Sequence, residues 1–438
     1  MNEPLPEGWA RTTVGGICLP VEKADPRWSP DLEFEYIDIG GVDRRTGRII
    51  RTKSIRGAEA PSRARQLVRT GDTVLSTVRV YLAKIAIVPA RLDNAIASTG
   101  FSVLRPAVGI HPMFLMFQTL SDEFLALLDS KQTGTSYPAV RDRDVRKMPL
   151  RIAPSYEQER IVQRIEDIFT RLNAVEMTLK CLINRLRLLR SAVLADAFCA
   201  DRDLPPDWIS MTVGDVAEVQ LGRQRSPKHH TGKQLRPYLR AANVTWDGIS
   251  LDDVKEMNFD DREFERYRLE PHDLLLNEAS GTPSEVGKPA IWGGEIKDCC
   301  FQNTLLRLRP QGLDLDYLYW YCYFSASTGR FGEASRGVNI RHLGKRGLSR
   351  FPIPVAPHGE QSRIADDISN QFHNIRLLRE SIEDAQNRVA ALRRSVLAEA
   401  FAGRLVPQDP EDEPASVLLE RIAAFRPTMP RRRRKARA

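Results

Sequence analysis

The sequence predicts an α+β protein made of two tandem head domains and two long helices that form an antiparallel coiled coil. Three observations carry this prediction. Matching phrases recur at nearly constant spacing, short apolar segments punctuated by Gly and Pro precede each repeated end, and two long stretches keep a seven-residue apolar pattern. A chain of 438 residues exceeds one ordinary domain, so a duplicated arrangement also fits the length.

The internal repeat covers both ends of each copy. The matched phrases are LPEGW and LPPDW (from 5 and 204), APSYEQERIV and APHGEQSRIA (from 153 and 356), and LRSAVLADAF and LRRSVLAEAF (from 189 and 392). Their spacing stays between 199 and 204, whereas the central parts, roughly 45–130 and 247–330, hardly match. Two copies of one module with different central parts are therefore expected.

The first part of each copy has the pattern of a mixed α+β domain. In the first copy, TVLSTVRVYLAKIAIV (73–88) and FSVLRP (101–106) are apolar runs typical of strands, and residues 111–130 have a helical pattern. Gly and Pro separate these segments, as in a compact domain with short turns.

Each copy ends with a long predicted helix. Ser155 with Gln158 has the spacing of a capping box; the second copy has His358 in place of the serine and keeps Gln361. Gly403 is a suitable C-terminal stop. The apolar seam repeats in the same register in both helices, and the residues expected to form the coiled coil are Ile161, Ile165, Leu172, Leu179, Leu186, Val193, Ile364, Ile368, Ile375, Ile382, Val389 and Val396.

An antiparallel pair of these helices would place the two heads at opposite ends, related by a pseudo-two-fold axis. From Ile161 to Val193 the seam spans about 48 Å at 1.5 Å per residue, which exceeds one turn of DNA. The plainer alternative is that each helix only covers its own head. Gln371 interrupts the second seam in this alignment and is a candidate for fixing its register.

Composition narrows the class of protein. A hydrophobic content of 42% supports packed cores, and the absence of an 18-residue apolar run or a signal-peptide core predicts a cytoplasmic location. The six cysteines form no CxxC pair and the histidines form no HExxH, so we expect reduced, mostly buried thiols and no metal site. The last 13 residues carry seven of the basic groups, so the +8 net charge is largely a property of a disordered tail.

Basic residues are nevertheless concentrated within each head. Nine lie between Arg44 and Arg69 against one acid, and six lie between Leu221 and Trp246 with no acid. Such clusters suit DNA phosphates, and Arg, Asn and Gln suit base edges; the alternative is a set of solvated loops. The candidate DNA-binding residues are Arg44, Arg45, Arg48, Arg51, Lys53, Arg79, Ser136, Tyr137, Arg141, Arg223, Gln224, Arg225, Lys228, Arg240, Asn243, Asn339 and Arg341, with Thr135 as a further phosphate ligand.

Three stretches imitate catalytic motifs without matching them. GTPSEVGKP (281–289) has one residue too many for a phosphate loop and Pro289 where Ser or Thr should stand. LPPDW faintly resembles an amino-methyltransferase motif, but its repeat mate LPEGW does not. Asp273 with Glu295 and Lys297 resembles a nuclease metal site for which the first copy offers no equivalent. No catalytic residues are therefore predicted.

The combination of LPEGW, GTSYPAV, PLRIAPSYEQERIV and LRRSVLAEAFAGRLV resembles the specificity subunits of type I restriction–modification enzymes over about residues 5–407. The resemblance implies two target-recognition domains that each read half of a split DNA site, and two conserved helices that set the spacing and dock two methyltransferase subunits. A restriction subunit would join them. S-adenosylmethionine, ATP and Mg are then expected on the partner subunits, where adenine N6 would be methylated, and this chain would bind no cofactor.

The boundaries that follow are 1–154 for the first recognition domain, 155–200 for the central helix, 201–356 for the second recognition domain, 357–403 for the distal helix and 404–438 for a C-terminal segment with the basic tail. The second copy replaces GTSYPAV by GVNIRHL, which puts a DNA-binding role for the matching residues there in doubt. Two alternatives stay open: a non-catalytic coiled-coil scaffold with basic loops, and a stand-alone DNA-modifying enzyme.

Overall fold

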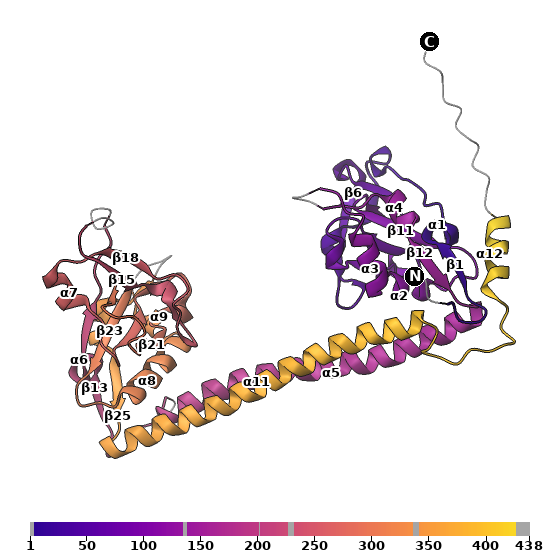
Figure 1. The fold of residues 1–438 in the computed structure, drawn as a ribbon. Coiled ribbons are helices and arrows are strands. Elements are labelled where there is room, and N and C mark those ends of the chain that lie inside the picture. Colours follow the sequence, from indigo (N-terminus) through magenta and orange to yellow (C-terminus); the bar gives the residue numbers. More distant parts are fainter. Residues whose placement is uncertain (1–3, 135–137, 201, 227–231, 336–340, 426–438) are drawn as a thin grey trace, which may run out of the picture. The chain divides into compact units, whose positions relative to one another are not determined.

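The computed structural model describes residues 4–134, 138–200, 202–226, 232–335 and 341–425 (Figure 1). The chain divides into two compact units. Unit 1 comprises residues 1–178 and 385–438, and unit 2 comprises 179–384, so each unit contains one head and a part of each long helix. No helix of the described ranges is long and apolar enough to cross a bilayer.

The head of unit 1 is built on two four-stranded sheets and a strand pair that joins its two ends. The sheet of order β2-β11-β8-β9 contains Cys18–Leu19, Phe101–Pro106, Thr73–Ser76 and Ile85–Ile87. The sheet of order β6-β3-β10-β7 contains Lys53–Arg56, Glu33–Ile37, Ile96–Ser98 and Ala64–Leu67. The strand pair is β1 with β12, Ala10–Thr13 with Pro149–Ile152.

Short helices and one hairpin complete this head. The helices are α1 (Val14–Ile17), α2 (Pro112–Thr119), α3 (Asp122–Asp129) and α4 (Asp142–Arg146). The hairpin joins β4 (Val42–Asp43) to β5 (Arg48–Ile49). Apolar residues of α2 such as Phe114 and Leu115 are fully buried against the helix-facing core, which also takes in the adjoining parts of the long helices.

The head of unit 2 repeats this plan. Its strand pair is β13 with β25, Ile209–Thr212 with Pro352–Val355. Its sheets have the orders β14-β23-β19-β21 and β18-β15-β22, formed by Ala217–Leu221, Leu305–Pro310, Leu274–Asn277 and Pro289–Ile291, and by Lys255–Asn258, Leu235–Leu239 and Cys300–Phe301. The remaining elements are β16 (Val244–Thr245), β17 (Gly248–Ile249), β20 (Ala279–Ser280), β24 (Arg341–His342), α6 (Val213–Val216), α7 (Asp261–Tyr267), α8 (Leu315–Ser327), α9 (Arg330–Ala334) and α10 (Gly344–Ser349).

The junction of head and helix is the same in both units and explains the repeated Glu-Gln phrase. The buried Trp9 indole donates to the Glu157 carboxylate at 3.0 Å, and Trp208 donates to Glu360 at 3.1 Å. The following glutamine, Gln158 in unit 1, is fully buried and accepts from the backbone N–H of His111 while donating to the carbonyl of Ala153, both at 2.9 Å. These bonds satisfy polar groups that would otherwise be buried without partners.

In unit 2, Gln361 makes the same two hydrogen bonds. It accepts from the N–H of Asp314 and donates to the carbonyl of Ala356, both at 2.8 Å. The glutamine therefore ties the first turn of the long helix to the strand that precedes it and to the start of α8. A helix fixed at its first turn by buried hydrogen bonds leaves the head in a defined direction.

The two long helices are α5 (Ser155–Ala197) and α11 (His358–Phe401). In unit 1 the start of α5 packs against the end of α11, with Ile161 and Ile165 in the same core as Leu397 and Phe401. In unit 2 the end of α5 packs against the start of α11 in a second core. In both units the two helices therefore pack end to start, and all 12 predicted seam residues lie buried or half-buried.

The apolar steps of three and four also place Val175, Leu189 and Gln371 on the seam, but these three side chains are exposed. Gln371 is exposed, and Phe372 takes the covered place, so Gln371 does not interrupt the packed face. In α5, Val175 and Leu189 are 45% and 46% exposed, whereas Glu176 and Arg190, one residue later, are half-buried. Long charged side chains cover apolar surface with their aliphatic stems, which apolar periodicity alone does not reveal.

The segment between α11 and the basic tail contains a packed helix that the sequence did not predict. Helix α12 (Ala415–Ala424) contributes Leu418 and Ile422 to the core of unit 1. The Ala415 N–H donates to the carbonyl of Gly8 at 2.8 Å, and Arg160 pairs with Asp412 at 2.7 Å. Residues 404–425 thus belong to the packed unit, while the basic residues 426–438 lie outside the described ranges.

Five of the six cysteines are buried as free thiols, as predicted, and Cys181 is exposed. Burial raises the pKa of Cys299 and of Cys300 to about 12, so both thiols are protonated at neutral pH. They behave as small apolar core residues.

Candidate nucleic-acid interface

Exposed basic side chains follow one another along the β4–β5 hairpin and strand β6 of unit 1. Arg44, Arg48 and Arg51 are exposed, and they make no ion pair within the described part of the chain. Gly41 permits this close turn, because a Cβ there would lie 2.0 Å from the Arg51 carbonyl oxygen. Free guanidinium groups on a hairpin and its following loop are suited to contacts with phosphate oxygens.

Two further basic candidates of the same group have partners in the protein. Lys53 pairs with Asp38 at 2.8 Å and keeps 56% of its side chain exposed. Partial burial opposes ionisation of Asp38, but Lys53 and the N–H groups of the following turn outweigh it and lower the pKa of that carboxyl. Arg45 pairs with Glu176 of α5 at 3.4 Å, so the hairpin contacts the helix as well as solvent.

Arg79 and Arg141 are brought together by the backbone. Arg79 has a left-handed conformation (φ 49°), and its N–H donates to the carbonyl of Pro138 at 2.9 Å. The Thr77 carbonyl accepts from the N–H of Val140 at 2.8 Å. Arg141 then occupies the N-cap position of α4, and its side chain is exposed and makes no capping hydrogen bond. The candidates Ser136 and Tyr137, with Thr135, belong to the intervening segment, which lies outside the described residues, as do Lys228 and Asn339.

The structure separates the candidates of unit 2 into surface and interior residues. Gln224 and Arg225 are exposed after β14. Arg223 is only 5% exposed; it pairs with Glu263 at 2.6 Å and donates to the carbonyl of Asn258 at 2.6 Å. Its guanidinium thus anchors α7 to the sheet, and its burial removes it from the surface that DNA could reach.

Asn243 is also an interior residue. It is 2% exposed, its Oδ1 accepts from the N–H of Arg240 at 3.1 Å, and its Nδ2 donates to the carbonyl of Ser250 at 3.0 Å. Arg240 is half-buried and pairs with Asp253, and Arg341 donates to the carbonyl of Gly332 at 2.7 Å. An Asn that satisfies its own turn is not available to read a base.

The catalytic look-alikes have structural roles. Asp273 is 1% exposed and pairs with Arg309 at 2.6 Å. The matching residue in unit 1 is Asp72, which pairs with Arg105 at 2.9 Å, so this aspartate forms a structural ion pair in both copies. Lys288, in the stretch 281–289 that imitates a phosphate loop, forms an ion pair with Glu285. No cluster of three metal-ligating side chains occurs in the ranges that the structure describes.

Sequence reasoning missed a pair of stacked arginines at matching places. Arg393 lies over the Phe169 ring in unit 1 and Arg190 over the Phe372 ring in unit 2, each 4.9 Å from the ring centroid. Both residue pairs obey the 203-residue offset of the repeat. Applying that offset to the polar residues of the helices, and not only to the apolar ones, would have found them.

The fold and these surfaces define a class: a duplicated protein in which two similar α+β heads with different exposed basic residues are each joined by a fixed junction to a long helix. A family model for the type I restriction modification DNA specificity domain matches residues 205–386. Residues 205–386 thus belong to this family of DNA specificity domains, and the chain as a whole is similar to the specificity subunits of type I restriction–modification systems.

The relatives and solved structures agree. The StySPI specificity subunit of Salmonella potsdam is 23% identical over 96% of both chains, and the EcoKI specificity subunit of Escherichia coli K12 is 24% identical over 74% of both. A structure described as the structural basis of complex assembly and conformational transition of the type I R-M system matches with a TM-score of 0.80 and 28% identity, covering 92% of this chain and 100% of the other. The HsdS subunit from Thermoanaerobacter tengcongensis matches with a TM-score of 0.59 and 29% identity, covering 92% and 99%.

Proposed function

We propose that this chain is the DNA sequence-recognition subunit of a type I restriction–modification complex and that it binds an asymmetric, bipartite DNA site. The observation that carries the proposal is the contrast within the repeat. The head–helix junctions are the same in both units, whereas the exposed basic side chains of the two heads differ. Two different reading surfaces on one repeated scaffold suit a site with two different halves.

In this proposal α5 and α11 form an antiparallel coiled coil with a pseudo-two-fold axis. The end-to-start packing in each unit supports it, as do the 12 buried or half-buried seam residues. A continuous pair of helices would hold the two heads at a fixed separation. That separation would then set the number of base pairs between the two half-sites.

The heads would reach DNA through their exposed cations. In unit 1 these are Arg44, Arg48, Arg51 and Arg141, with Arg79 beside them; in unit 2 they include Arg225, with Gln224 as a base-reading candidate. Arg223 and Asn243 are left out because both are buried. Arginine provides the planar donor pair that suits phosphate and guanine edges.

We also propose that the chain docks two adenine-N6 methyltransferase subunits and a restriction subunit. S-adenosylmethionine, ATP and Mg would be held by those partners. The exposed faces of α5 and α11 near each junction are the matched surfaces that two equal partners would use. This chain's own part in the reaction would be to select and orient the DNA.

The direct test is to co-express the chain with the methyltransferase of its own system and to map methylated adenines across a genome. We expect a motif of two unlike specific parts separated by a fixed number of unspecified bases. A continuous or palindromic motif would contradict the proposal. The chain expressed without the methyltransferase should leave no methylated adenine, and methylation by the chain alone would favour the stand-alone enzyme instead.

Head-specific substitutions test which surface reads which half. Replacing Arg51 and Arg141 by Ala should weaken duplex binding and lower its salt dependence by about one unit of slope per lost phosphate contact. Relaxed sequence preference should be confined to one half of the motif. Replacing Arg225 should affect the other half, and loss of both halves in either variant would indicate a folding defect.

The helix pair can be tested by length. Inserting one heptad into the middle of α5 and one into the middle of α11 keeps the seam in register and adds about 10 Å. The mapped motif should keep both halves and gain base pairs between them. An unchanged spacer would contradict the role proposed for the helices.

A further inference from the structure

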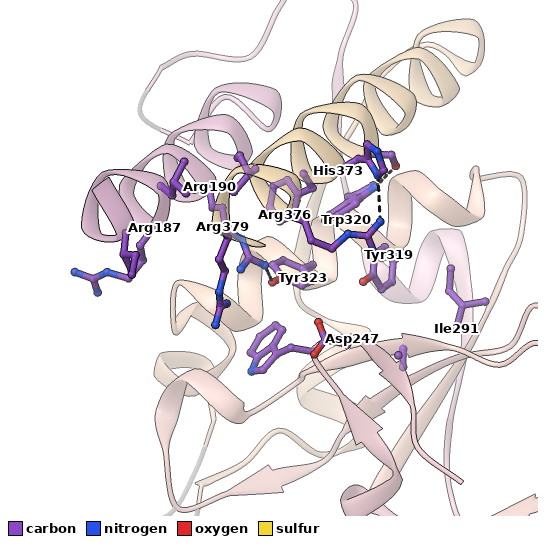
Figure 2. A pocket seen from close by; sticks show the side chains of 18 residues that line it. Arg187, Arg190, Asp247, Ile291, Tyr319, Trp320, Tyr323, His373, Arg376 and Arg379 are labelled. Atoms are coloured by element: carbon purple, nitrogen blue, oxygen red, sulfur yellow. Dashed lines mark hydrogen bonds between the residues drawn. The ribbon is translucent and has the colours of Figure 1, made fainter. Parts of the chain in front are cut away.

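Unit 2 contains a cavity of about 850 Å³ that the proposed DNA recognition does not use (Figure 2). It is open to solvent on one side and lined by the end of α5, the first half of α11, helix α8 and the β16–β17 hairpin. Its apolar side is formed by residues such as Leu186, Phe372 and Ile375, and its aromatic wall by α8 and Trp246. The volume lies within the range of pockets that hold ligands or side chains of a partner.

The cavity is strongly cationic. Arg187 and Arg190 come from α5 and Arg376 and Arg379 from α11, and Asp247 on the opposite hairpin is the acidic side chain among the lining residues (Figure 2). Arg379 also pairs with Glu383 at 2.9 Å and Arg376 with Glu380 at 4.0 Å, in exposed pairs that solvent screens. Arg187 makes no ion pair within the described residues.

At the equivalent position of unit 1, the arginines bind a carboxylate of the protein itself. Arg393, the counterpart of Arg190, donates to the carboxylate of Glu176 at 3.2 Å, and Arg45 approaches the same carboxylate at 3.4 Å. Arg393 also donates to Asn173 at 2.7 Å. A carboxylate held between two guanidinium groups and beside an aromatic ring therefore fills this position in unit 1.

In unit 2 the charges at these positions are exchanged. The 203-residue offset puts Arg379 at the place of Glu176 and Arg376 at the place of Asn173. Asp247 lies in the turn of the matching hairpin, where unit 1 has Arg45. Unit 2 thus keeps the stacked Arg190 and its ring but lacks the carboxylate on the helix. Two arginines take its place beside an open cavity.

We infer that this cavity is a docking site for an acidic segment of a partner protein, in which a carboxylate binds Arg190 and Arg379 as Glu176 binds Arg393 and Arg45 in unit 1. The apolar side of the cavity favours a segment that alternates Glu or Asp with Leu or Ile. Since unit 1 satisfies the same position internally, the segment binds unit 2 alone. The site makes the two ends of the protein inequivalent for partners, and it does not depend on DNA recognition.

The test is binding of a fluorescein-labelled peptide, Glu-Leu-Glu-Glu-Leu-Glu, to the full chain, measured by anisotropy. The matched peptide with Gln in place of Glu should bind at least about 10-fold more weakly, because charge-assisted bonds to arginine are lost. Arg379→Glu copies unit 1, supplies the carboxylate internally and should weaken binding about 10-fold or more. Arg388→Glu, an exposed position of α11 outside the cavity, makes the same charge change and should leave binding within about 2-fold.

Arg187→Ala provides a second variant if Arg379→Glu fails to fold, which circular dichroism will show; it should weaken the peptide about 3- to 10-fold. Equal binding of the two peptides, equal effects of Arg379→Glu and Arg388→Glu, or no binding to the unchanged chain would overturn the inference. Displacement of the peptide by millimolar inorganic phosphate or by duplex DNA, lost in Arg379→Glu, would assign the site to phosphate or to the DNA backbone and would also overturn it. Resistance of the bound peptide to both competitors supports it.

Discussion

The two heads share a backbone plan but carry opposite charges at several matching places. In unit 1, Asp38 pairs with Lys53; in unit 2 the matching turn carries Arg240, which pairs with Asp253. Where Arg45 meets Glu176 in unit 1, unit 2 has Asp247 and Arg379. The charge at a matching surface position can therefore reverse between the two units, so surface recognition can diverge without altering the packed core.

The buried parts differ far less. Both heads use a Trp donating to the first-turn Glu, a Gln bonded on both sides of the junction and an Asp–Arg pair across the central sheet. Buried polar groups must keep their partners, because an unpaired one costs more free energy than the bond contributes. The following changes test how far this likeness of the interiors extends, from the largest expected effect to the smallest.

The first prediction concerns the Asp–Arg pair. Asp72→Ala leaves the guanidinium of Arg105, 15% exposed, without its counter-ion, and we expect a loss of about 3–5 kcal/mol in the stability of unit 1. Asp273→Ala should cost about 2 kcal/mol, because Arg309 is 30% exposed and keeps Glu270 at 3.2 Å. Hydrogen exchange of β11 and β23 in the full chain measures both, and equal losses would contradict the comparison.

The stacked arginines should come next. Arg393→Ala removes a ring contact and the bonds to Glu176 and Asn173, so unit 1 should lose about 1–2 kcal/mol. Arg190→Ala removes a ring contact and a bond to the Tyr323 hydroxyl, and unit 2 should lose about 1 kcal/mol or less. Urea unfolding, followed by hydrogen exchange in each unit, measures the two losses of stability separately. Arg388→Ala, at an exposed site of α11, is the control.

The junction of unit 1 has a pH dependence with a defined sign. Burial raises the pKa of Glu157, and the Trp9 indole and Arg160 lower it only in part. With the folded pKa above the unfolded one, the stabilisation by the protonated carboxyl is full below the unfolded pKa and is lost as pH rises through the folded pKa. Glu157→Gln keeps an acceptor for Trp9, so its stability relative to the unchanged chain should rise by under about 1 kcal/mol between pH 4 and pH 8.

The control for this prediction is Glu360→Gln in unit 2. That change also removes an exposed pair with Arg363 at 2.9 Å, so it should give no gain at pH 8. Thermal unfolding across the pH range measures both variants. A relative stability of Glu157→Gln that falls with pH would reverse the assigned sign.

The smallest effect should come from the exposed pair of unit 1. Exchanging the two residues, Asp38→Lys with Lys53→Asp, keeps an ion pair with its cation on the turn, where unit 2 has Arg240, and should change stability by less than about 0.5 kcal/mol. The single change Lys53→Asp places like charges together and should cost about 0.5–1 kcal/mol. A double-mutant cycle measures the coupling, and a loss in the double variant equal to that in the single one would contradict a simple charge pair.

Much of the fold followed from the sequence because its signals are local. The heptad positions of α5 and α11 are marked by apolar residues at steps of three and four. The helix does begin at Ser155, but the predicted capping box is wrong, because the Ser155 hydroxyl donates to the carbonyl of Gly109 at 3.3 Å and the Gln158 side chain bonds outside the helix. The prediction that Val175 and Leu189 lie on the seam was wrong, because Glu176 and Arg190 cover the apolar surface there with the aliphatic parts of their side chains. Helix α12 was not anticipated because its packing on unit 1 depends on contacts far apart along the chain, such as that of Ala415 with Gly8.

The candidate interface was predictable as a region but not residue by residue. Composition located the basic stretches, but it could not distinguish exposed Arg51 from buried Arg223. Nor could it distinguish an Asn that reads a DNA base from an Asn, such as Asn243, whose side chain bonds to its own turn. Those distinctions depend on neighbours such as Glu263 and Ser250, which fold in from distant positions.

The sequence by itself determined that the protein is a duplicated head–helix chain, because spacing and periodicity are properties of order along the chain. Only the tertiary structure decided what the repeated Glu-Gln phrase does, which arginines face solvent and where a carboxylate is missing. The physical reason is that burial and ion pairing depend on which residues meet in space, and the same offset of 203 residues places a carboxylate beside an arginine in one unit and a second arginine in the other.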